Sequence, residues 1–334
     1  MTVRSQADFD SSGTPTCEAP PACLAIGFIV GPTGAGKTAF AIEIAERLGA
    51  EIVNADSRQV YRGMDIGTAK PTQAERSRVP HHLIDIRPPD HPLDVAEFSR
   101  LAREAIAEIA RRGRPVLAVG GSGLYLRALR GGIFRGPAAS AEIRERLALT
   151  AAEKGVPYLH ERLRQIDPEA ARRIGVNDLY RISRALEVFE LTGEPISIHQ
   201  ARHRFSNRNF RSLTVGVAMD RAQLYDAINR RFDEMIARGL VEEVRRLIGS
   251  GYRVDRPPLS SIGYREIGAW LAGQMTMEEA VEKAKRESRR FAKRQMTWFR
   301  ADPEVRWLDP SRFAEQAWIL FREFFAGRAE RQRM

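Results

Sequence analysis

The stretch Gly31-Pro32-Thr33-Gly34-Ala35-Gly36-Lys37-Thr38 decides the fold class of this 334-residue chain. It fits the phosphate-loop pattern G-x-x-x-x-G-K-[ST] at every fixed position. Residues 24–30 before it form an apolar run of strand length, and residues 39–48 after it read as a helix. In such a loop the backbone N–H groups hold a phosphate, the lysine reaches the terminal phosphates and the threonine hydroxyl ligates Mg²⁺. The sequence therefore predicts a polyphosphate with magnesium at Lys37 and Thr38, without identifying the reaction.

Strands and helices alternate around this loop. Residues 51–55 and 115–119 read as further buried strands, and residues 213–219 alternate like another. This alternation favours an α/β fold, a parallel sheet flanked by helices on both faces. Ligands bind at the carboxyl ends of such strands, so we expect the phosphate loop, Asp56 and the turn Gly120-Gly121-Ser122-Gly123 to converge. The remaining expected elements of the core are one helix over 223–247, another over 277–300 and a short strand over 305–308.

The strand signal disappears between residues 134 and 205, where four segments read as helices. We interpret this block as an all-helical insertion into the phosphate-loop core. The expected organisation is a flexible tail over 1–22, a core over 23–133 plus 206–325, the insertion over 134–205 and a tail over 326–334.

Charge and composition narrow the class of partner. The formal charge of +10, from 53 basic and 43 acidic residues, favours a polyanionic partner, most commonly nucleic acid; an Arg-rich composition that only solvates the surface is the alternative. Cys17 and Cys23 are the only cysteines, which argues against a disulfide framework and fits a reducing, cytoplasmic setting. No apolar run approaches the ~20 residues that a membrane span needs, and no secretory signal is present.

Three further groups of residues could carry chemistry. Asp56 follows a predicted strand and could anchor magnesium, accept a proton from a nucleophile, or cap a helix. His81 and His82 with Asp85 lack a third spaced ligand, so packing and hydrogen bonding are favoured over a metal site. Basic side chains share one face of the last long helix and form a smaller patch in the insertion, as a nucleic-acid surface or a solvated face: Arg286, Arg290, Lys293 and Arg294, and Arg181 with Arg184.

Several separated blocks resemble the tRNA dimethylallyltransferase family, also called tRNA isopentenyltransferases. The resemblance spans nearly everything from Gly31 to about Leu308 and is specific because the blocks are many. Beside the phosphate loop they are Asp56-Ser57-x-Gln59-Val60-Tyr61, Gly63-Met64-Asp65-Ile66-Gly67-Thr68-Ala69-Lys70-Pro71, Pro80-His81-His82-Leu83-Ile84-Asp85, Gly120-Gly121-x-Gly123-Leu124-Tyr125, Arg181-x-x-Arg184-Ala185-Leu186-Glu187, Gly263-Tyr264-Arg265-Glu266 and Lys293-Arg294-Gln295-x-x-Trp298-x-Arg300.

The resemblance implies transfer of a dimethylallyl group from dimethylallyl diphosphate to N6 of the adenine 3′ of the anticodon, in tRNAs that read codons beginning with U. It implies Asp56 and Ser122 as catalytic residues, Mg²⁺ on Thr38, and a monomer that binds the anticodon stem-loop. The diphosphate would lie on residues 31–38 and Arg231. The tRNA would contact Asp56, Ser57, Arg58, Gln59, Ser122, Arg144, Tyr180, Arg181, Ile182, Ser183, Arg184, Lys293 and Arg294.

Two positions depart from the family pattern. Ser122 stands where the family usually has Thr, and it keeps the hydroxyl. Ala227 replaces the first Arg of an Arg-Ile-x-x-Arg pattern, so Arg230 or Arg231 must compensate if that Arg touches diphosphate. The zinc finger of eukaryotic relatives is absent, which implies a bacterial type.

Three other functions stay open on the sequence alone. A phosphate-loop phosphotransferase would consume ATP without tRNA, although no clean second-metal motif supports it. Prenyl transfer to free AMP, ADP or ATP would use the same phosphate loop, but the helical insertion favours RNA. A non-catalytic RNA-binding protein would bind the stem-loop and release no diphosphate.

Overall fold

The computed structural model describes residues 24–132, 136–203 and 210–329. Its centre is a six-stranded sheet in the order β3-β2-β4-β1-β5-β6, and every pair of neighbouring strands is parallel. The α/β fold class is thereby confirmed. The strands are β1 (Leu24–Val30), β2 (Glu51–Asn54), β3 (His81–His82), β4 (Val116–Gly120), β5 (Phe210–Val217) and β6 (Val305–Leu308).

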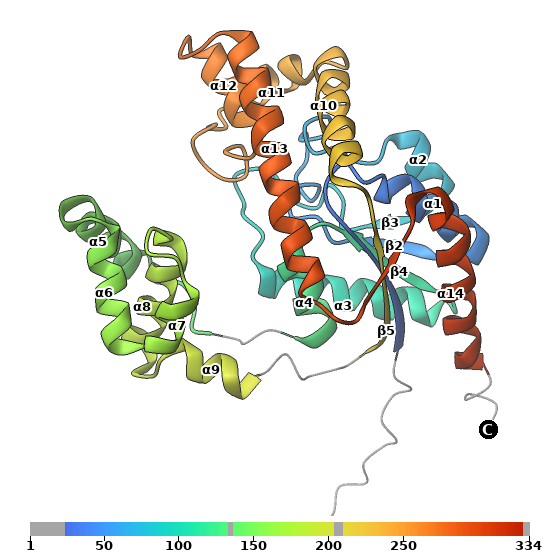
Figure 1. Ribbon diagram of the computed structural model, residues 1–334, viewed down its shortest axis with the longest axis horizontal. Helices are drawn as coiled ribbons and strands as arrows, with labels where there is room; N and C mark the ends of the chain where they lie inside the picture. Colours follow the sequence, from blue (N-terminus) through green and yellow to red (C-terminus); the bar gives the residue numbers. More distant parts are fainter. Residues whose placement is uncertain (1–23, 133–135, 204–209, 330–334) are drawn as a thin grey trace, which may run out of the picture.

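Helices cover both faces of the sheet because its strands alternate apolar side chains between two cores. Ile26 and Phe28 of β1 face one core, with helices α3 (Val95–Arg111) and α4 (Gly123–Gly131). Ile29 faces the other core, with α1 and α14. Figure 1 shows α1 and α14 together on one side of the sheet and α3 with α4 on the other. These helices run over Lys37–Leu48 and Phe313–Ala329, and a short helix α2 over Gln73–Arg78 precedes β3.

A group of helices begins beyond the carboxyl ends of the strands, and the last of them runs back down beside the sheet to α4 (Figure 1). They are α10 (Arg221–Ala237), α11 (Leu240–Gly249), α12 (Tyr264–Leu271) and α13 (Met277–Arg300). The prediction of a single helix over 223–247 is therefore wrong, because the helix is interrupted at Gly239. That residue has a φ of 97°, which a glycine adopts without strain, and the next helix starts directly after it.

The described residues between α4 and β5 contain helices only, and these pack on a core of their own that includes Leu159, Leu163 and Leu186. Figure 1 shows this block standing beside the sheet, on the side where α4 and the end of α13 lie. Its helices are α5 (Ala141–Lys154), α6 (Val156–Ile166), α7 (Pro168–Arg173), α8 (Leu179–Thr192) and α9 (Ile196–His203).

The structure describes the C-terminal region as far as Ala329 but not the N-terminal residues before Leu24. The tail predicted over 1–22 lies outside the described residues. Helix α14 continues to Ala329, so the C-terminal tail expected from residue 326 cannot begin there. Within the described residues, no helix combines the length and the apolar character that crossing a bilayer requires.

Candidate active site

The phosphate loop joins β1 to α1 at the carboxyl edge of the sheet. Gly36 precedes the helix with a left-handed φ of 75°, so the loop turns sharply and leaves the first N–H groups of α1 unpaired by any side-chain cap. Lys37 Nζ donates to the Pro32 carbonyl at 2.7 Å. Unpaired N–H groups and a lysine at a helix N-terminus form an anion site.

Three charged side chains influence one another at the loop. Burial lowers the pKa of Lys37 to about 8, Asp56 opposes this shift and Arg231 adds to it. Burial also lowers the pKa of Arg231, again against the attraction of Asp56. The two cations and one carboxylate therefore share a desolvated site, where a bound anion would gain much more than in water.

Asp56 stands just after β2, as predicted, and a hydrogen-bonded turn fixes it. Asn54 Oδ1 accepts from the Asp56 N–H at 3.1 Å, and Asp56 Oδ1 accepts from the Arg58 N–H at 2.8 Å. Ser122 Oγ accepts from the Ser57 N–H at 3.0 Å, across the sheet edge from the Gly120–Gly123 turn. The structure thus brings Asp56 and Ser122 into one site.

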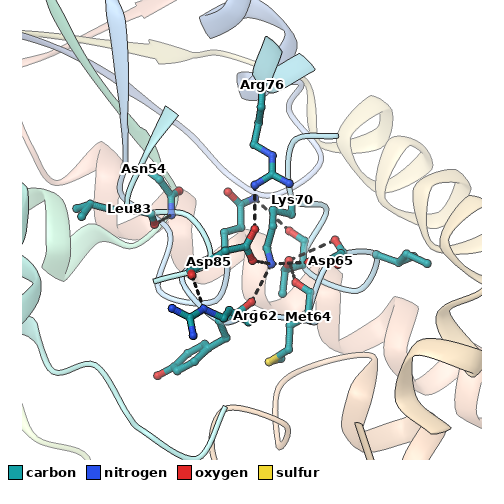
Figure 2. Close-up of polar contacts among 12 residues, drawn as sticks. Asn54, Arg62, Met64, Asp65, Lys70, Arg76, Leu83 and Asp85 are labelled. Atoms are coloured by element: carbon teal, nitrogen blue, oxygen red, sulfur yellow. Dashed lines mark hydrogen bonds and ion pairs between the residues drawn. The ribbon is translucent and has the colours of Figure 1, made fainter. Parts of the chain in front are cut away.

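The loop over residues 63–71 forms another wall of this site. Gln59 Nε2 donates to the carbonyls of Thr68 and Ala69 at 3.2 and 3.1 Å, so its amide oxygen is left to face other groups. Lys70, whose side chain is only 1% exposed, pairs with Asp65 and Asp85 and donates to the Tyr61 carbonyl. Figure 2 shows these contacts meeting at the lysine. These three acceptors satisfy the buried lysine, which thereby ties the loop to Tyr61 and Asp85.

Glu243 of α11 holds the same loop from the other side. This carboxylate is 1% exposed and accepts from the backbone N–H groups of Asp65, Ile66 and Gly67 at 2.8–3.1 Å, and from the Tyr264 hydroxyl at 2.6 Å. Helices α11 (Leu240–Gly249) and α12 (Tyr264–Leu271) therefore position a wall of the site through one buried carboxyl group.

We expect Glu243→Gln to lower the free energy of unfolding by about 1–3 kcal/mol, because an amide cannot accept on both sides and leaves buried N–H groups unpaired. Urea unfolding measures this change. Glu242→Gln is the matched control: its side chain is exposed, and we expect a change within about 0.5 kcal/mol. Equal changes in the two variants would contradict the role given to Glu243.

Two cavities meet at this site. The first has a volume of 670 Å³ and is lined by the phosphate loop and by the loop that carries Thr68, with Gln59 on its wall. The second has a volume of 340 Å³; Ser57 and Ser122 line it together with apolar side chains of α10 and α13. Both are lined by Thr33, Gly34, Asp56, Thr68, Arg231 and Phe291. The arrangement can place one ligand in each cavity, with Asp56 in contact with both.

A cleft of 630 Å³ lies between α13, α4 and α8. It brings Arg181 of the helical block beside the basic face of α13, which joins two patches that are more than a hundred residues apart in the sequence. Its cationic lining, which we call the basic cleft, is Arg127, Arg181, Arg290, Lys293 and Arg294.

Other predicted residues lie elsewhere. Ile182 is 0% exposed in the core of the helical block, so its side chain cannot reach a surface ligand, and this part of the prediction is wrong for the side chain. Arg144 and Arg184 both pair with the buried carboxylate of Glu187. Tyr180 is 76% exposed on the same helix as Arg181.

The two histidines make polar contacts within the fold. His82 Nε2 contacts Glu51 at 2.7 Å, and His81 Nδ1 contacts the Val79 carbonyl at the same distance. The described residues hold no group of three or more histidine, cysteine, aspartate or glutamate side chains placed for a metal.

Sequence reasoning missed several residues of the site. Arg127 of α4 stacks over the Trp298 ring, with 4.3 Å to its centroid, and lines the basic cleft. Ser260 and Ser261 line the second cavity. Glu243 has no signal of its own in the sequence, whereas Tyr264 and Gln295 belong to blocks that match the family pattern.

The chain is similar to known proteins along most of its length. The IPP transferase family model matches residues 59–302. The chain is 52% identical over 286 residues to a tRNA dimethylallyltransferase of Geobacter metallireducens, covering 85% of this chain and 93% of that protein. It is 50% identical to one of Syntrophobacter fumaroxidans, over 86% of this chain and 84% of that protein.

A solved structure agrees with these relatives. The tRNA isopentenylpyrophosphate transferase of Bacillus halodurans superimposes with a TM-score of 0.68 at 40% identity, covering 93% of this chain and 99% of that one. The resemblance drawn from the sequence blocks is thus confirmed, and the chain belongs to the IPP transferase family.

Proposed function

We propose that this protein transfers a dimethylallyl group from dimethylallyl diphosphate to N6 of an adenine next to the anticodon of tRNA. The observation that carries the proposal is the meeting of two cavities at Asp56, with the phosphate loop on one of them. The relatives named tRNA dimethylallyltransferase support the reaction class.

The first cavity suits the diphosphate. Lys37, Arg231 and the loop N–H groups surround the position where negative charge grows as the allylic C–O bond breaks. Thr38, in the first turn of α1, would ligate a Mg²⁺ whose other ligands are diphosphate oxygens and water, which is the usual way this ion binds. The ion would neutralise charge on the leaving diphosphate.

The second cavity suits the adenine. Ser57 and Ser122 line it, and Ser122 directly precedes α4, whose Arg127 lines the basic cleft. The lone pair of N6 would attack the allylic carbon while the bond to the diphosphate oxygen breaks. Asp56 would accept the proton that N6 loses, so charge and atoms balance. Because an adenine amine is a weak nucleophile, its orientation against the allylic carbon contributes most.

The basic cleft suits the phosphates of the anticodon stem-loop. Five cationic side chains line it, and Tyr180, which precedes Arg181 in the sequence, has an exposed ring that would offer a stacking surface for a base. A base in a single-stranded loop costs less energy to extrude than a base paired in a duplex, which favours a single-stranded acceptor. We propose that the helical block over residues 134–205 acts with α13 as a clamp on one stem-loop, and that one protein molecule suffices.

We expect Lys293→Ala and Arg294→Ala each to weaken tRNA binding and to reduce the dependence of log Kd on log salt by about one unit, because each variant removes one phosphate contact. Titrations at several salt concentrations measure both quantities. Arg312→Ala, at an exposed position before α14, is the control and should leave the slope unchanged. Unchanged slopes in both cleft variants would remove α13 from the RNA surface.

Affinity for dimethylallyl diphosphate in the absence of RNA should fall as the pH rises above about 8. The sign follows from Lys37: burial lowers its pKa to about 8, and only its cationic form attracts the diphosphate. Between pH 7 and pH 9 the cationic fraction falls about ten-fold. Isothermal titration across this range measures the effect, and Lys37→Met should bind weakly with a flat profile. A flat profile in the unmodified protein would contradict this role of Lys37.

The phosphotransferase alternative is not favoured, because the relatives are prenyltransferases. Transfer to a free adenine nucleotide is less well supported, since it gives the basic cleft and the helical block no role. Offering tRNA and AMP together as acceptors, with dimethylallyl diphosphate labelled in its prenyl group, separates these two prenyl-transfer reactions. We expect the labelled prenyl group on tRNA.

Mass spectrometry of tRNA nucleosides from cells with and without the gene tests the proposal. We expect N6-dimethylallyladenosine, or a nucleoside derived from it, to disappear on deletion and to return on complementation. An unchanged nucleoside profile after deletion would overturn the proposed function.

A further inference from the structure

Helix α13 presents two faces that the proposed function uses separately. Arg290, Lys293 and Arg294 line the basic cleft, whereas Phe291 and Gln295 line the first cavity. Figure 1 shows this helix running from the upper helices down to α4. A single rigid element therefore touches both the proposed RNA surface and the diphosphate cavity.

Gln295 makes the direct connection to the phosphate loop. It is 7% exposed, and its Oε1 accepts from the Thr33 N–H at 2.8 Å while its Nε2 donates to the Gly121 carbonyl at 2.9 Å. Because one partner is an N–H and the other a carbonyl, the orientation of the amide is fixed. Gln295 thus ties the phosphate loop to the turn that carries Ser122.

Close packing makes this connection stiff. A Cβ on Gly123 would lie 2.1 Å from the indole nitrogen of Trp298, so α13 lies directly against the start of α4. Trp298 in turn lines the basic cleft under Arg127. A displacement of α13 at the cleft would therefore also move Gln295, one helical turn away, and with it the Thr33 N–H that Gln295 binds.

We propose that Gln295 is a positioning residue that couples RNA binding in the basic cleft to diphosphate binding in the phosphate loop; this inference rests on the proposed function. RNA phosphates on Arg290, Lys293 and Arg294 stabilise the seated position of α13. In that position Gln295 aims the Thr33 N–H and holds the loop ready for the diphosphate. Both ligands stabilise the same arrangement, so each tightens the binding of the other.

The sign of the effect is informative. RNA and diphosphate are both anions, and their direct repulsion would make each weaken the other. The adenine also meets the prenyl group directly, so the Gln295→Leu variant is needed to show which part of a mutual tightening passes through the protein. Removing the two hydrogen bonds of Gln295 should abolish the tightening and leave only the repulsion.

The experiment measures the affinity of a non-transferable thiolo analogue of dimethylallyl diphosphate with and without a saturating anticodon stem-loop RNA. In the unmodified protein we expect the RNA to tighten analogue binding at least about five-fold. In Gln295→Leu we expect this factor to fall to one or below. The affinity for the analogue measured without RNA should change by less than about ten-fold. Gln223→Leu, on the exposed start of α10, is the matched control and should keep the factor.

Several outcomes would overturn the inference. One is a factor of one in the unmodified protein, and another is an unchanged factor in Gln295→Leu. A third is a folded Gln295→Leu that loses more than ten-fold in analogue affinity without RNA, because the residue would then build the site. Gln295→Met serves as a second variant if Gln295→Leu does not fold. Failure of the unmodified protein to bind the analogue or the RNA at all would instead contradict the proposed function.

Discussion

Asp56→Asn is expected to lower the turnover of prenyl transfer by ~10²–10⁴-fold while tRNA affinity changes little. The carboxylate lies where the two cavities meet, and the backbone turn from Asn54 to Arg58 holds it in place. An amide of the same shape keeps the packing but cannot accept the proton that N6 loses. Single-turnover transfer to a labelled stem-loop, measured beside an RNA titration, separates the two effects.

Asp226→Asn is the matched control for this change. Asp226 lies on an exposed face of α10 and lines neither cavity. We expect it to keep full turnover. An Asp56→Asn protein that transfers at the normal rate with intact RNA binding would show that another group takes the proton.

Lys37→Met is expected to lower kcat/KM for dimethylallyl diphosphate by ~10²–10³-fold or more, since removing one preorganised donor from a developing oxyanion has about this effect. Lys37 is a half-buried residue of the phosphate loop, so water replaces its charge only poorly. The loss should appear in kcat as well as in KM, because the negative charge on the diphosphate is largest in the transition state. Steady-state kinetics with tRNA in excess measure the split.

Lys283→Met provides the comparison, because this lysine of α13 lines none of the cavities described above. It should leave both constants unchanged. If Lys37→Met changed KM alone, the lysine would bind the ground state and contribute nothing more to the transition state.

Local patterns in the sequence were enough to predict much of the core. Helix α13 has its predicted bounds, Met277–Arg300, and a capping box at Thr276 marks its start. Strand β1 also has its predicted bounds, because an apolar run ends at a glycine. The two-residue strand β3 is too short for any periodicity to show. The break at Gly239 was missed because the apolar pattern continues through it.

The site was only partly predictable, for a different physical reason. The phosphate loop, Asp56 and Ser122 follow strands of one parallel sheet, so topology alone brings them to one edge. Glu243 instead reaches the Asp65 N–H across 178 residues, and Gln295 reaches the Gly121 carbonyl across 174. No local pattern encodes such contacts. The burial of Ile182 likewise depends on how α8 packs in its own core.

The most direct measurement follows two products from the purified protein given Mg²⁺, dimethylallyl diphosphate, an unmodified anticodon stem-loop and ATP. We expect one diphosphate to be released for each N6-dimethylallyladenosine formed, with ATP left intact. Rapid cleavage of ATP with no transfer to a competent RNA acceptor would contradict the claim that the phosphate loop holds a prenyl diphosphate.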